Sequence, residues 1–480
     1  MSSVRAKLLL LASRLLRLPS SSGDFLLPLS SCCGRAIFAR RPRTPYRQIA
    51  LFARIAVTIL LCDIVLTSIF WPSYTRLPPC YENLKKVVST SSTAGRGNTH
   101  NEKVFIAAVL YDPHGELAGG QWGDALGQLI DLLGQDNVFL SLYENNSGEK
   151  GRQALEALSH RIPSNKSIVV DVDEHTTFDS FPRVTLPNGE RRIKRIDYLA
   201  ALRNYALRAL DEQSHFKYDK LIFLNDVYFK PVEALQLLFC TNAHTRRTTP
   251  AYRAACAVDF SNPFKFYDSY ATRDLAGYGI GLPFFPWFTT AGHGKSRRDV
   301  LAGRDAVRVR SCWGGMVAFN AWYFQKEYPV RFRANNEIFW DASECCLVHA
   351  DMQDAPGVVD EIQDTGVYMN PFVRVAYTPR TLMWLGTTRR FERLYACVHD
   401  LLNRVVGLPW YNPRRTEVPG TKVQQEVWVP GEGGRGGGSF QTVEVTGGND
   451  GFCGRRGMEV VVEDRKPGQD GFEALPVPSQ

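Results

Sequence analysis

The chain has 480 residues, of which 44% are hydrophobic and 22% are charged, and this composition is typical of a folded protein with one or two domains. Residues 1–54 contain nine Arg, one Lys and one Asp and carry a net charge of +9, whereas the whole chain carries +8, so the remaining residues sum to −1. The body is therefore nearly neutral and lacks the basic footprint of a nucleic-acid-binding protein.

An apolar segment, IAVTILLCDIVLTSIFW at 55–71, directly follows this basic arm. Extended back to residue 49, it is long enough to span a bilayer, although it includes Asp63 and Arg54. Because positive charge is retained on the cytosolic side, the arm favours a single-pass type II anchor over a buried core helix. We expect a cytosolic tail at 1–48, a transmembrane anchor at 49–71, a stem at 72–102 and a body in the lumen of the Golgi or ER.

If the body is lumenal, two sequons could be glycosylated and the cysteines could form disulfides. Asn145 and Asn165 each begin an Asn-X-Ser sequence and are candidate glycosylation sites. None of the eleven cysteines forms a CxxC pair, so a zinc ribbon is not indicated. Disulfides can form in such a compartment, and their pairing is left open among Cys240, Cys256, Cys312, Cys345, Cys346 and Cys397.

The body alternates between strand and helix patterns. Short apolar runs predict strands at 103–110, 138–143, 167–172, 221–224, 254–258 and 316–319. Helical spacing of apolar residues predicts helices at 122–133, 151–161, 193–210 and 232–239. This order indicates an α/β fold with a mainly parallel sheet, forming one catalytic domain at 103–412. The aromatic and Pro-rich stretch at 283–288 reads as an irregular insertion, and the polar, Gly-rich residues 413–480 are expected to be largely disordered.

The stretch KLIFLNDVYFK at 220–230 is the best candidate for a functional strand end. A buried strand ends in Asn225 and Asp226, and a helix pattern follows, which is where an α/β sheet presents ligands. A carboxylate there can share Mg²⁺ or Mn²⁺ with the phosphates of a sugar nucleotide. The alternative is an ordinary turn, because Asn and Asp side chains satisfy local backbone groups.

Other acids offer competing metal sites. Asp171 and Asp173 point to one face at the end of another predicted strand, which suits either a metal or solvent, and Asp259 ends a third strand. His349 and Asp351 alternate along ECCLVHAD, and in an extended segment they would project together as hard ligands. A single His is otherwise most often a core or surface residue.

Two further features suit a sugar nucleotide. Arg203 could pair with a diphosphate through its planar guanidinium, or it could simply be solvated on a helix surface. Trp313, followed by Gly314 and Gly315, could form an aromatic sugar platform with close backbone approach, or a tight turn with the Trp in the core.

Six stretches together resemble the family of fungal capsule-associated proteins and cryptococcal α-1,3-mannosyltransferases (glycosyltransferase family 69). They are KVFIAAVLYD at 103–112, YLAALRNYAL at 198–207, LIFLNDVYF at 221–229, CAVDF at 256–260, RVRSCWGGMVAFN at 308–320 and SECCLVHADM at 343–352. The resemblance covers about residues 100–412. It implies a type II Golgi enzyme with a GT-A-like fold and a divalent cation, Mn²⁺ or Mg²⁺. It also implies retaining transfer of mannose from GDP-mannose to a glycan acceptor of the capsule, cell wall or a glycoconjugate.

The resemblance also suggests a role for each matched position. Asp226 would bind the metal, but the usual second acid is replaced by Tyr228. Either His349 or Asp351 would complete the coordination, or the site would work with little metal dependence. The remaining assignments are donor binding by Arg203, Asn204, Asn225 and Asp259, acceptor binding by Trp313, Gly314 and Gly315, and catalysis by Glu344 with Asp226.

Two other classes of function remain open at this point. The missing second acid at Tyr228 motivates a membrane-anchored carbohydrate-binding or accessory protein of polysaccharide synthesis or export, with little catalysis. Asp171 and Asp173 motivate a metal-dependent hydrolase, which would be distinguished by which acid governs metal binding.

Overall fold

The computed structural model describes residues 45–171, 178, 181–243, 250–354, 361–431, 437–464 and 469–478. The chain divides into two compact units, residues 1–59 and 60–480. In the first unit the described residues are the beginning of helix α2, Pro45–Phe70. The segment Gln48–Phe70 of this helix is long and apolar enough to cross a membrane, in agreement with the predicted span.

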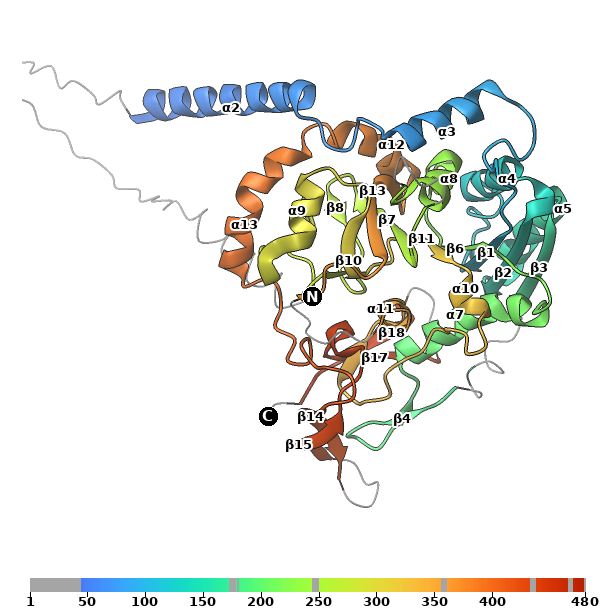
Figure 1. Cartoon of the computed structure of the whole chain (residues 1–480). Helices are drawn as coiled ribbons and strands as arrows, with labels where there is room; N and C mark the ends of the chain where they lie inside the picture. Colours follow the sequence, from blue (N-terminus) through green and yellow to red (C-terminus); the bar gives the residue numbers. More distant parts are fainter. Residues whose placement is uncertain are drawn as a thin grey trace, which may run out of the picture. The chain divides into compact units, whose positions relative to one another are not determined.

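The second unit is built around a ten-stranded sheet (Figure 1). Its order is β3-β2-β1-β6-β11-β7-β13-β10-β9, and β8 pairs with β7. Strands β1, β2, β3, β6, β7 and β13 run in the same direction, whereas β11 and β10 run against them. The sheet is therefore mixed but mostly parallel, and the predicted α/β fold with a mainly parallel sheet is confirmed. The bounds are β1 Val104–Leu110, β2 Val138–Asn145, β3 Asn165–Asp171, β6 Lys220–Leu224, β7 Ala254–Asn262, β8 Lys265–Phe266, β9 Arg273–Asp274, β10 Val307–Ser311, β11 Met316–Asn320 and β13 Val367–Ala376.

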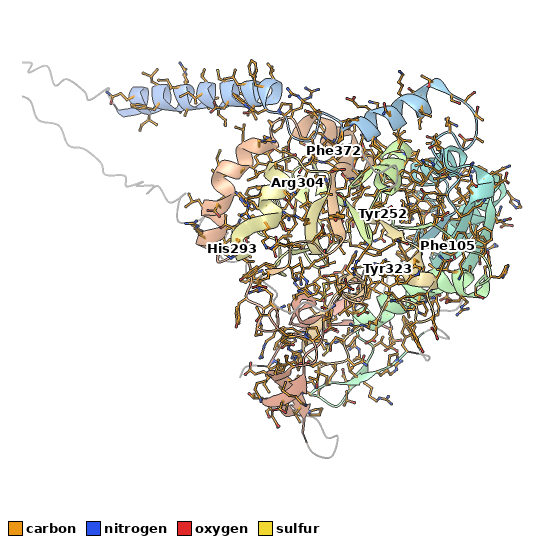
Figure 2. The ribbon with its side chains drawn as sticks, viewed as in Figure 1. Phe105, Tyr252, His293, Arg304, Tyr323 and Phe372 are labelled. Atoms are coloured by element: carbon orange, nitrogen blue, oxygen red, sulfur yellow. A yellow bond between two sulfur atoms is a disulfide. The ribbon has the colours of Figure 1, made fainter. Side chains whose placement is uncertain are left out.

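Both faces of the sheet are covered, which explains why the central strands are apolar throughout. On one face Val104 and Ile106 of β1 pack with residues of α4 (Gln121–Leu133), α5 (Gly148–Arg161) and α8 (Pro231–Cys240). On the other face Phe105 and Ala107 pack into a core that includes α7 (Arg195–Glu212) and part of α11 (Glu344–Ala350). Phe105 and Tyr252, labelled in Figure 2, are both buried.

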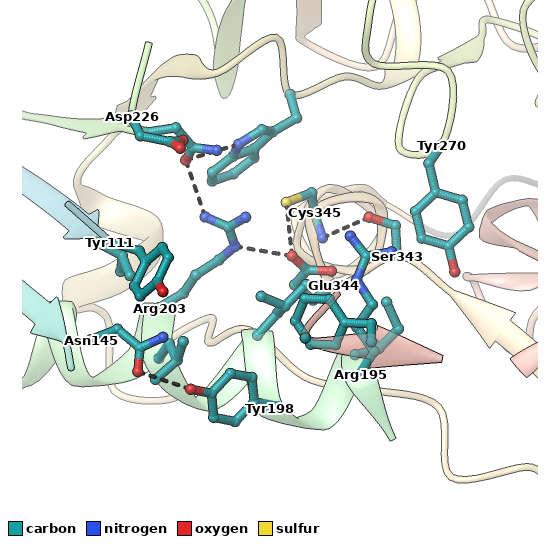
Figure 3. A pocket seen from close by; sticks show the side chains of 18 of the residues that line it. Tyr111, Asn145, Arg195, Tyr198, Arg203, Asp226, Tyr270, Ser343, Glu344 and Cys345 are labelled. Atoms are coloured by element: carbon teal, nitrogen blue, oxygen red, sulfur yellow. Dashed lines mark hydrogen bonds and ion pairs between the residues drawn. The ribbon is translucent and has the colours of Figure 1, made fainter. Parts of the chain in front are cut away.

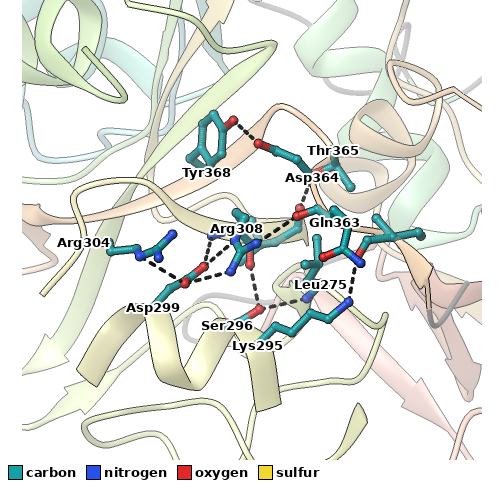
Figure 4. A network of polar contacts seen from close by, with 12 residues as sticks. Leu275, Lys295, Ser296, Asp299, Arg304, Arg308, Gln363, Asp364, Thr365 and Tyr368 are labelled. Atoms are coloured by element: carbon teal, nitrogen blue, oxygen red, sulfur yellow. Dashed lines mark hydrogen bonds and ion pairs between the residues drawn. The ribbon is translucent and has the colours of Figure 1, made fainter. Parts of the chain in front are cut away.

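Helix α9 (Lys295–Leu301) is fastened to β10 by a polar network (Figure 4). The Asp299 carboxylate is nearly buried and accepts hydrogen bonds from Arg308 Nε at 2.7 Å and NH2 at 2.9 Å. Ser296 Oγ donates to the Arg308 carbonyl and accepts from the Leu275 amide. Because a bidentate Arg–carboxylate pair with low solvent access is strong, it fixes β10 against α9. Strand β10 ends at Ser311, two residues before Trp313.

Two predicted segment boundaries differ from the structure. The expected stem includes α3, Pro79–Thr90, whose Tyr81 is fully buried and whose Cys80 forms a disulfide with Cys240. The stem was misread because its polar, Ser- and Thr-rich end hides the few apolar residues that dock.

The expected disordered tail is wrong for the described part of 413–480. That part forms β14 (Lys422–Pro430) with β15 (Gly438–Thr446), β16 (Gly454–Arg456) with β12 (Trp340–Ala342), and β17 (Met458–Val461) with β18 (Phe472–Leu475). Trp428, Met458 and Val460 are buried with Leu186 and Phe339. Gly-rich composition suggested disorder, but it belongs to the connection between β14 and β15.

The structure settles the cysteine pairing that the sequence left open. The pairs are Cys80–Cys240, Cys256–Cys312 and Cys346–Cys453, and free thiols among the described residues are those of Cys62, Cys345 and Cys397. The third disulfide joins the C-terminal segment to α11.

Candidate active site

A cavity of about 690 Å³ opens where the strands of the parallel part of the sheet end (Figure 3). Residues just beyond β1, β2, β6 and β7 line it, as the carboxyl edge of such a sheet requires. The polar and charged lining residues are Tyr111, Asn145, Asn146, Arg195, Tyr198, Arg203, Asn225, Asp226, Asp259, Tyr267, Asp268, Tyr270, Ser343, Glu344, Cys345 and Tyr377, with Trp313 and Phe472 among the aromatic ones.

Arg203 is the centre of this lining. It lies on α7 and its Nε donates to Glu344 Oε1 at 3.0 Å, while NH1 donates to Asn225 Oδ1 at 3.2 Å. Its guanidinium carbon is 4.4 Å from the Trp313 ring centroid, and the Trp313 indole also donates to Asn225 Oδ1 at 3.3 Å. Both side chains of the ion pair are largely buried, at 11% exposure for Arg203 and 4% for Glu344. Four predicted residues therefore form one connected unit.

Glu344 owes its position to the start of α11. The Ser343 side chain caps this helix by accepting from the Cys345 amide, so Glu344 is the first helical residue. A carboxylate is favoured there by the positive end of the helix dipole. The Cys345 thiol also lies on the cavity wall and donates to Glu344 Oε1 at 3.3 Å. Burial raises the pKa of Cys345 well above its ordinary value, so this thiol is neutral.

Asp226 presents a carboxylate to the cavity. It follows β6, and Asn225 before it is fixed because its amide donates to the Gly315 carbonyl and its carbonyl accepts from the Trp122 indole. The side chain of Asp226 is exposed, but protein surrounds the cavity that it faces. The resulting desolvation raises the pKa of Asp226, and its own backbone hydrogen bond and the charge of Arg203 partly oppose this.

A second acidic group, Asp259, lies deeper, within β7. Asp259 is buried and accepts from the Asp268 amide at 3.0 Å and from the Tyr377 hydroxyl at 3.1 Å. Asp268 in turn accepts from the Trp313 amide at 2.9 Å. Burial, and then the nearby charge of Asp268, raise the pKa of Asp259 well above its usual range. These contacts hold Trp313 in place, so Asp259 serves to position the wall of the cavity.

The structure brings together six of the predicted residues. Arg203, Asn225, Asp226, Asp259, Trp313 and Glu344 all line the cavity.

Three predicted ligand contacts are not supported. Asn204 is turned away, because its side chain both donates to and accepts from the backbone of Phe332. Gly314 and Gly315 have φ of +59° and +67°, and a Cβ at either position would clash with Ala257 or Val227. They therefore shape the turn after Trp313 and do not line the cavity.

The predicted metal partners of Asp226, His349 and Asp351, do not line the cavity that Asp226 faces. Residues 344–350 are helical, not extended, so His349 and Asp351 are rotated apart by about 200° on a helix of 3.6 residues per turn. Asp351 pairs with Arg333 at 2.8 Å, and His349 is fully buried beside the Cys256–Cys312 disulfide.

His349 is held in the core. Its Nδ1 donates to the Cys345 carbonyl at 2.6 Å, and burial lowers its pKa to about 4. The sulfurs nearby are committed to a disulfide, so this group is not a metal site.

The two sequons have different surroundings. Asn145 lines the cavity and its side-chain oxygen accepts from the Tyr198 hydroxyl at 2.8 Å. A glycan there would occupy the cavity, so the prediction of glycosylation at Asn145 is not supported. Asn165 is exposed at the start of the edge strand β3 and stays a candidate.

The competing acidic motif lies elsewhere. Asp171 is at the end of β3, where it accepts from the Tyr143 hydroxyl at 2.7 Å, and it does not line the cavity. Asp173 falls outside the described residues. The structure therefore gives the hydrolase hypothesis no site in the described part of the chain.

Several lining residues were missed by sequence reasoning. Asp268, Tyr270 and Tyr377 follow no strand or motif that the sequence pattern marks. Phe472 and Arg195 meet from distant parts of the chain, with the guanidinium 4.9 Å from the ring centroid. Only folding brings these groups together, so a single sequence offered no signal for them.

Weak structural similarity extends to a mannosyltransferase from Pyrobaculum calidifontis in complex with GDP-Man and Mn²⁺, with 12% identity and a TM-score of 0.33 over 70% of this chain and 72% of that one. A glucosyl-3-phosphoglycerate synthase from M. tuberculosis matches with 11% identity and a TM-score of 0.29 over 73% of this chain and 90% of that one. A mannosyl-3-phosphoglycerate synthase from Rubrobacter xylanophilus matches with 12% identity and a TM-score of 0.30 over 78% and 95%. No curated protein matches the sequence.

The family model described as cryptococcal mannosyltransferase 1 matches residues 103–351, which is more than half of the chain and holds most of the cavity. The chain therefore belongs to the cryptococcal mannosyltransferase 1 family and is a glycosyltransferase.

Proposed function

We propose that this protein is a type II membrane α-1,3-mannosyltransferase that moves mannose, with retention, from GDP-mannose to a glycan acceptor in the Golgi or ER. The observation that carries the proposal is the connected unit of Arg203, Glu344, Asn225 and Trp313 facing Asp226 across one cavity. An ion pair, an aromatic ring and an accessible carboxylate are the groups that a sugar diphosphate needs.

The cavity fits a divalent cation that is shared with the donor. Asp226 offers a hard oxygen ligand that is open to the cavity, and the described residues around it contain no ready-made cluster of three ligands there. Mg²⁺ or Mn²⁺ is often held by one or two carboxylates plus substrate phosphates, so a single acid is sufficient. We propose that Asp226 holds the cation against the diphosphate, where it would neutralise charge that develops on the leaving GDP.

Glu344 and Arg203 are proposed to act at the reacting sugar. In the transfer the bond from the anomeric carbon to the β-phosphate oxygen breaks, a bond to an acceptor hydroxyl oxygen forms, and the hydroxyl proton passes to the departing phosphate. The sugar becomes oxocarbenium-like, so the nearby carboxylate of Glu344 stabilises it. Arg203 fixes the orientation of that carboxylate and adds positive charge facing the departing phosphate. Front-face attack and a covalent glycosyl intermediate are both compatible with this arrangement.

The proposed location is supported by covalent chemistry. Three disulfides are typical of an oxidising compartment, and a basic arm precedes an apolar helix that is long enough to span. Asn165 would be accessible to the glycosylation machinery on the same side.

Donor turnover by the purified full chain tests the proposal. GDP release is measured with GDP-mannose, GDP-fucose and UDP-glucose, with Mn²⁺ or Mg²⁺ and with a chelator. We expect turnover of GDP-mannose only, lost with the chelator and in Asp226→Asn, and an axial-to-axial outcome at the anomeric carbon by NMR. Asp171→Asn is the matched control, because Asp171 is also a strand-end acid but lies outside the cavity. Turnover that survives Asp226→Asn refutes the metal assignment.

An accessory sugar-binding role is the second candidate, favoured by Tyr228 in place of a second acid. The backbone of Tyr228 is paired with that of Ala376, so its position is structural. Saturable binding of GDP-mannose without release of GDP, in the presence of cation and acceptor glycans, would establish this role.

A further inference from the structure

Helix α13, Tyr395–Val406, is amphipathic in the reverse sense to an ordinary surface helix. Its buried residues are polar: His399 and Asn403. His399 Nδ1 contacts Arg297 NH1 at 2.8 Å, and Asn403 Oδ1 accepts from the Leu282 amide at 2.8 Å. The helix is therefore fixed to the body by hydrogen bonds, and its apolar side is left facing outward.

The outward side of α13 carries a helical stripe of aliphatic residues. They recur at i, i+3, i+4, i+7 and i+8, the spacing of one face, and the stripe consists of Val398, Leu401, Leu402, Val405 and Val406. Their exposed fractions run from 39% to 71%. Scattered exposed apolar residues are ordinary on a protein surface, but a continuous stripe marks an interaction site.

Large apolar side chains are also exposed on the segments before and after α13 in the chain. Met383 and Trp384 are exposed on α12, Pro379–Thr388, which precedes α13 in the chain (Figure 1). Trp410 and Tyr411, at 66% and 88% exposure, follow α13 directly. Together with the five aliphatic residues these four form what we call the α12–α13 patch. Trp and Tyr are the residues that concentrate at membrane–water interfaces.

Hydrogen bonds hold the end of α12 close, along the chain, to the end of the apolar helix. Helix α2 ends at Phe70, and the Ser73 amide donates to the Arg389 carbonyl at the end of α12 at 2.9 Å. Arg389 in turn donates to the Tyr74 carbonyl at 3.1 Å, and Tyr74 is buried. Three residues span at most about 11 Å. The end of a membrane span is thus tethered to the helix that carries part of the patch.

We propose that the α12–α13 patch docks on the lipid surface into which the N-terminal helix is inserted. The proposal rests on the membrane anchoring proposed above. Apolar side chains enter the boundary between headgroups and acyl chains, as in interfacial amphipathic helices, and the exposed Arg380, Arg390 and Arg404 lie at the headgroup level. The catalytic body is then held against the membrane in one orientation and does not rotate freely on a stem. An acceptor carried by a lipid or by a membrane-bound glycan would meet the cavity from a fixed direction.

Lipid quenching tests the docking in the full chain. The protein is reconstituted in phosphatidylcholine vesicles with an environment-sensitive fluorescent amino acid in place of Val405 or, as matched control, of Tyr328. Tyr328 is 80% exposed and lies outside the patch. Phospholipids with a nitroxide near the headgroup should quench the probe at 405 several-fold more than the probe at 328. Equal, weak quenching of both probes would overturn the proposal.

A second variant separates docking from folding and from anchoring. Val398→Glu with Leu401→Glu places charge on the stripe at positions that are 48% and 63% exposed, so we expect the fold to be retained. We expect it to abolish the extra quenching at 405, whereas Tyr328→Glu leaves it unchanged. Unchanged quenching in the double variant refutes lipid docking.

Three further outcomes are distinguishable. Release of the unmodified protein by alkaline carbonate means that the anchor itself fails, which contradicts the proposed topology. Carbonate resistance without quenching at 405 rejects only the docking. A 405 probe that is shielded from both nitroxide lipid and aqueous iodide identifies a protein, such as a second copy of this chain, as the occupant, and this also overturns the lipid assignment.

Discussion

Removing the charge of Arg203 tests whether the Arg203–Glu344 pair is a buried structural pair, a catalytic pair, or both. Arg203→Met takes away the hydrogen bonds to Glu344 and Asn225 and the contact with Trp313, and it leaves Glu344, at 4% side-chain exposure, as an unpaired buried carboxylate. Breaking a buried ion pair from one side costs about 3–5 kcal/mol of unfolding free energy. Arg208→Met, on the exposed side of the same helix, should change it by less than about 0.5 kcal/mol.

The double variant Arg203→Met with Glu344→Gln separates the effect of the pair on stability from its effect on activity. With both charges gone the desolvation penalty disappears, so most of the lost stability should return, and a double-mutant cycle should give a coupling of about 2–3 kcal/mol. Activity should not return, because the carboxylate that stabilises the sugar is now absent, and the loss of one such electrostatic group costs about 10²–10³-fold in kcat.

Denaturant unfolding and GDP release are measured for the unmodified protein, Arg203→Met, Glu344→Gln and the double variant, with Arg208→Met as the control. If the single variant is as stable as the unmodified protein, the buried pair does not have the assigned energetic role. If the stable double variant turns over donor normally, then neither side chain takes part in catalysis, and that result would falsify the assignment.

Three other perturbations probe the scaffold and the pH dependence of its stability. Gly314→Ala should prevent folding, because φ is +59° and the new Cβ would lie 2.0 Å from the Ala257 carbonyl oxygen. The control is Gly386→Ala on α12, where a new Cβ meets nothing within 4 Å. Soluble yield and melting temperature compare the two variants, and a well-folded Gly314→Ala would contradict the turn geometry. Cys453→Ser removes the disulfide to Cys346 on α11 and should lower the free energy of unfolding by about 2–5 kcal/mol and also lower kcat. Unfolding and donor turnover are measured in oxidising buffer. Unchanged turnover would show that the C-terminal segment does not support the helix that carries Glu344. Burial raises the pKa of Asp274 to about 7, so the folded state keeps a proton that the unfolded state loses near pH 4, and the free energy of unfolding falls as pH rises between these values. Asp274→Asn should remove up to about 1.4 kcal/mol per pH unit of this slope. Parallel curves of unfolding free energy against pH for the two proteins would refute the prediction.

The local pattern of apolar and polar residues was enough to predict most strands of the sheet and the candidate metal ligand Asp226. Apolar runs and helical spacing predicted β1, β2, β3, β6, β7 and β11, and helices α4, α5, α7 and α8, because these elements bury whole faces. Asp226 was found because a buried strand followed by a polar turn and a helix is a local signal. Arg203 and Trp313 were candidates from residue type, and the family resemblance added Glu344.

Tertiary structure decided which of these residues act together. Sequence spacing suggested that His349 and Asp351 share a face, but the Ser343 cap begins a helix that points them apart, so a local conformation overturned a spacing argument. Asp268 and Phe472 reach the cavity through contacts that span long stretches of chain.

The chain ends show the same division. The sequence alone determined that a basic segment is followed by a segment long and apolar enough to span a membrane, since charge and hydropathy are summed over neighbouring residues. Composition could not determine that residues near Cys453 are folded, because a disulfide and a few buried aromatic residues outweigh a polar, Gly-rich average. Long-range pairing is a property of the folded chain, and only the structure placed the C-terminal strands at the wall of the site.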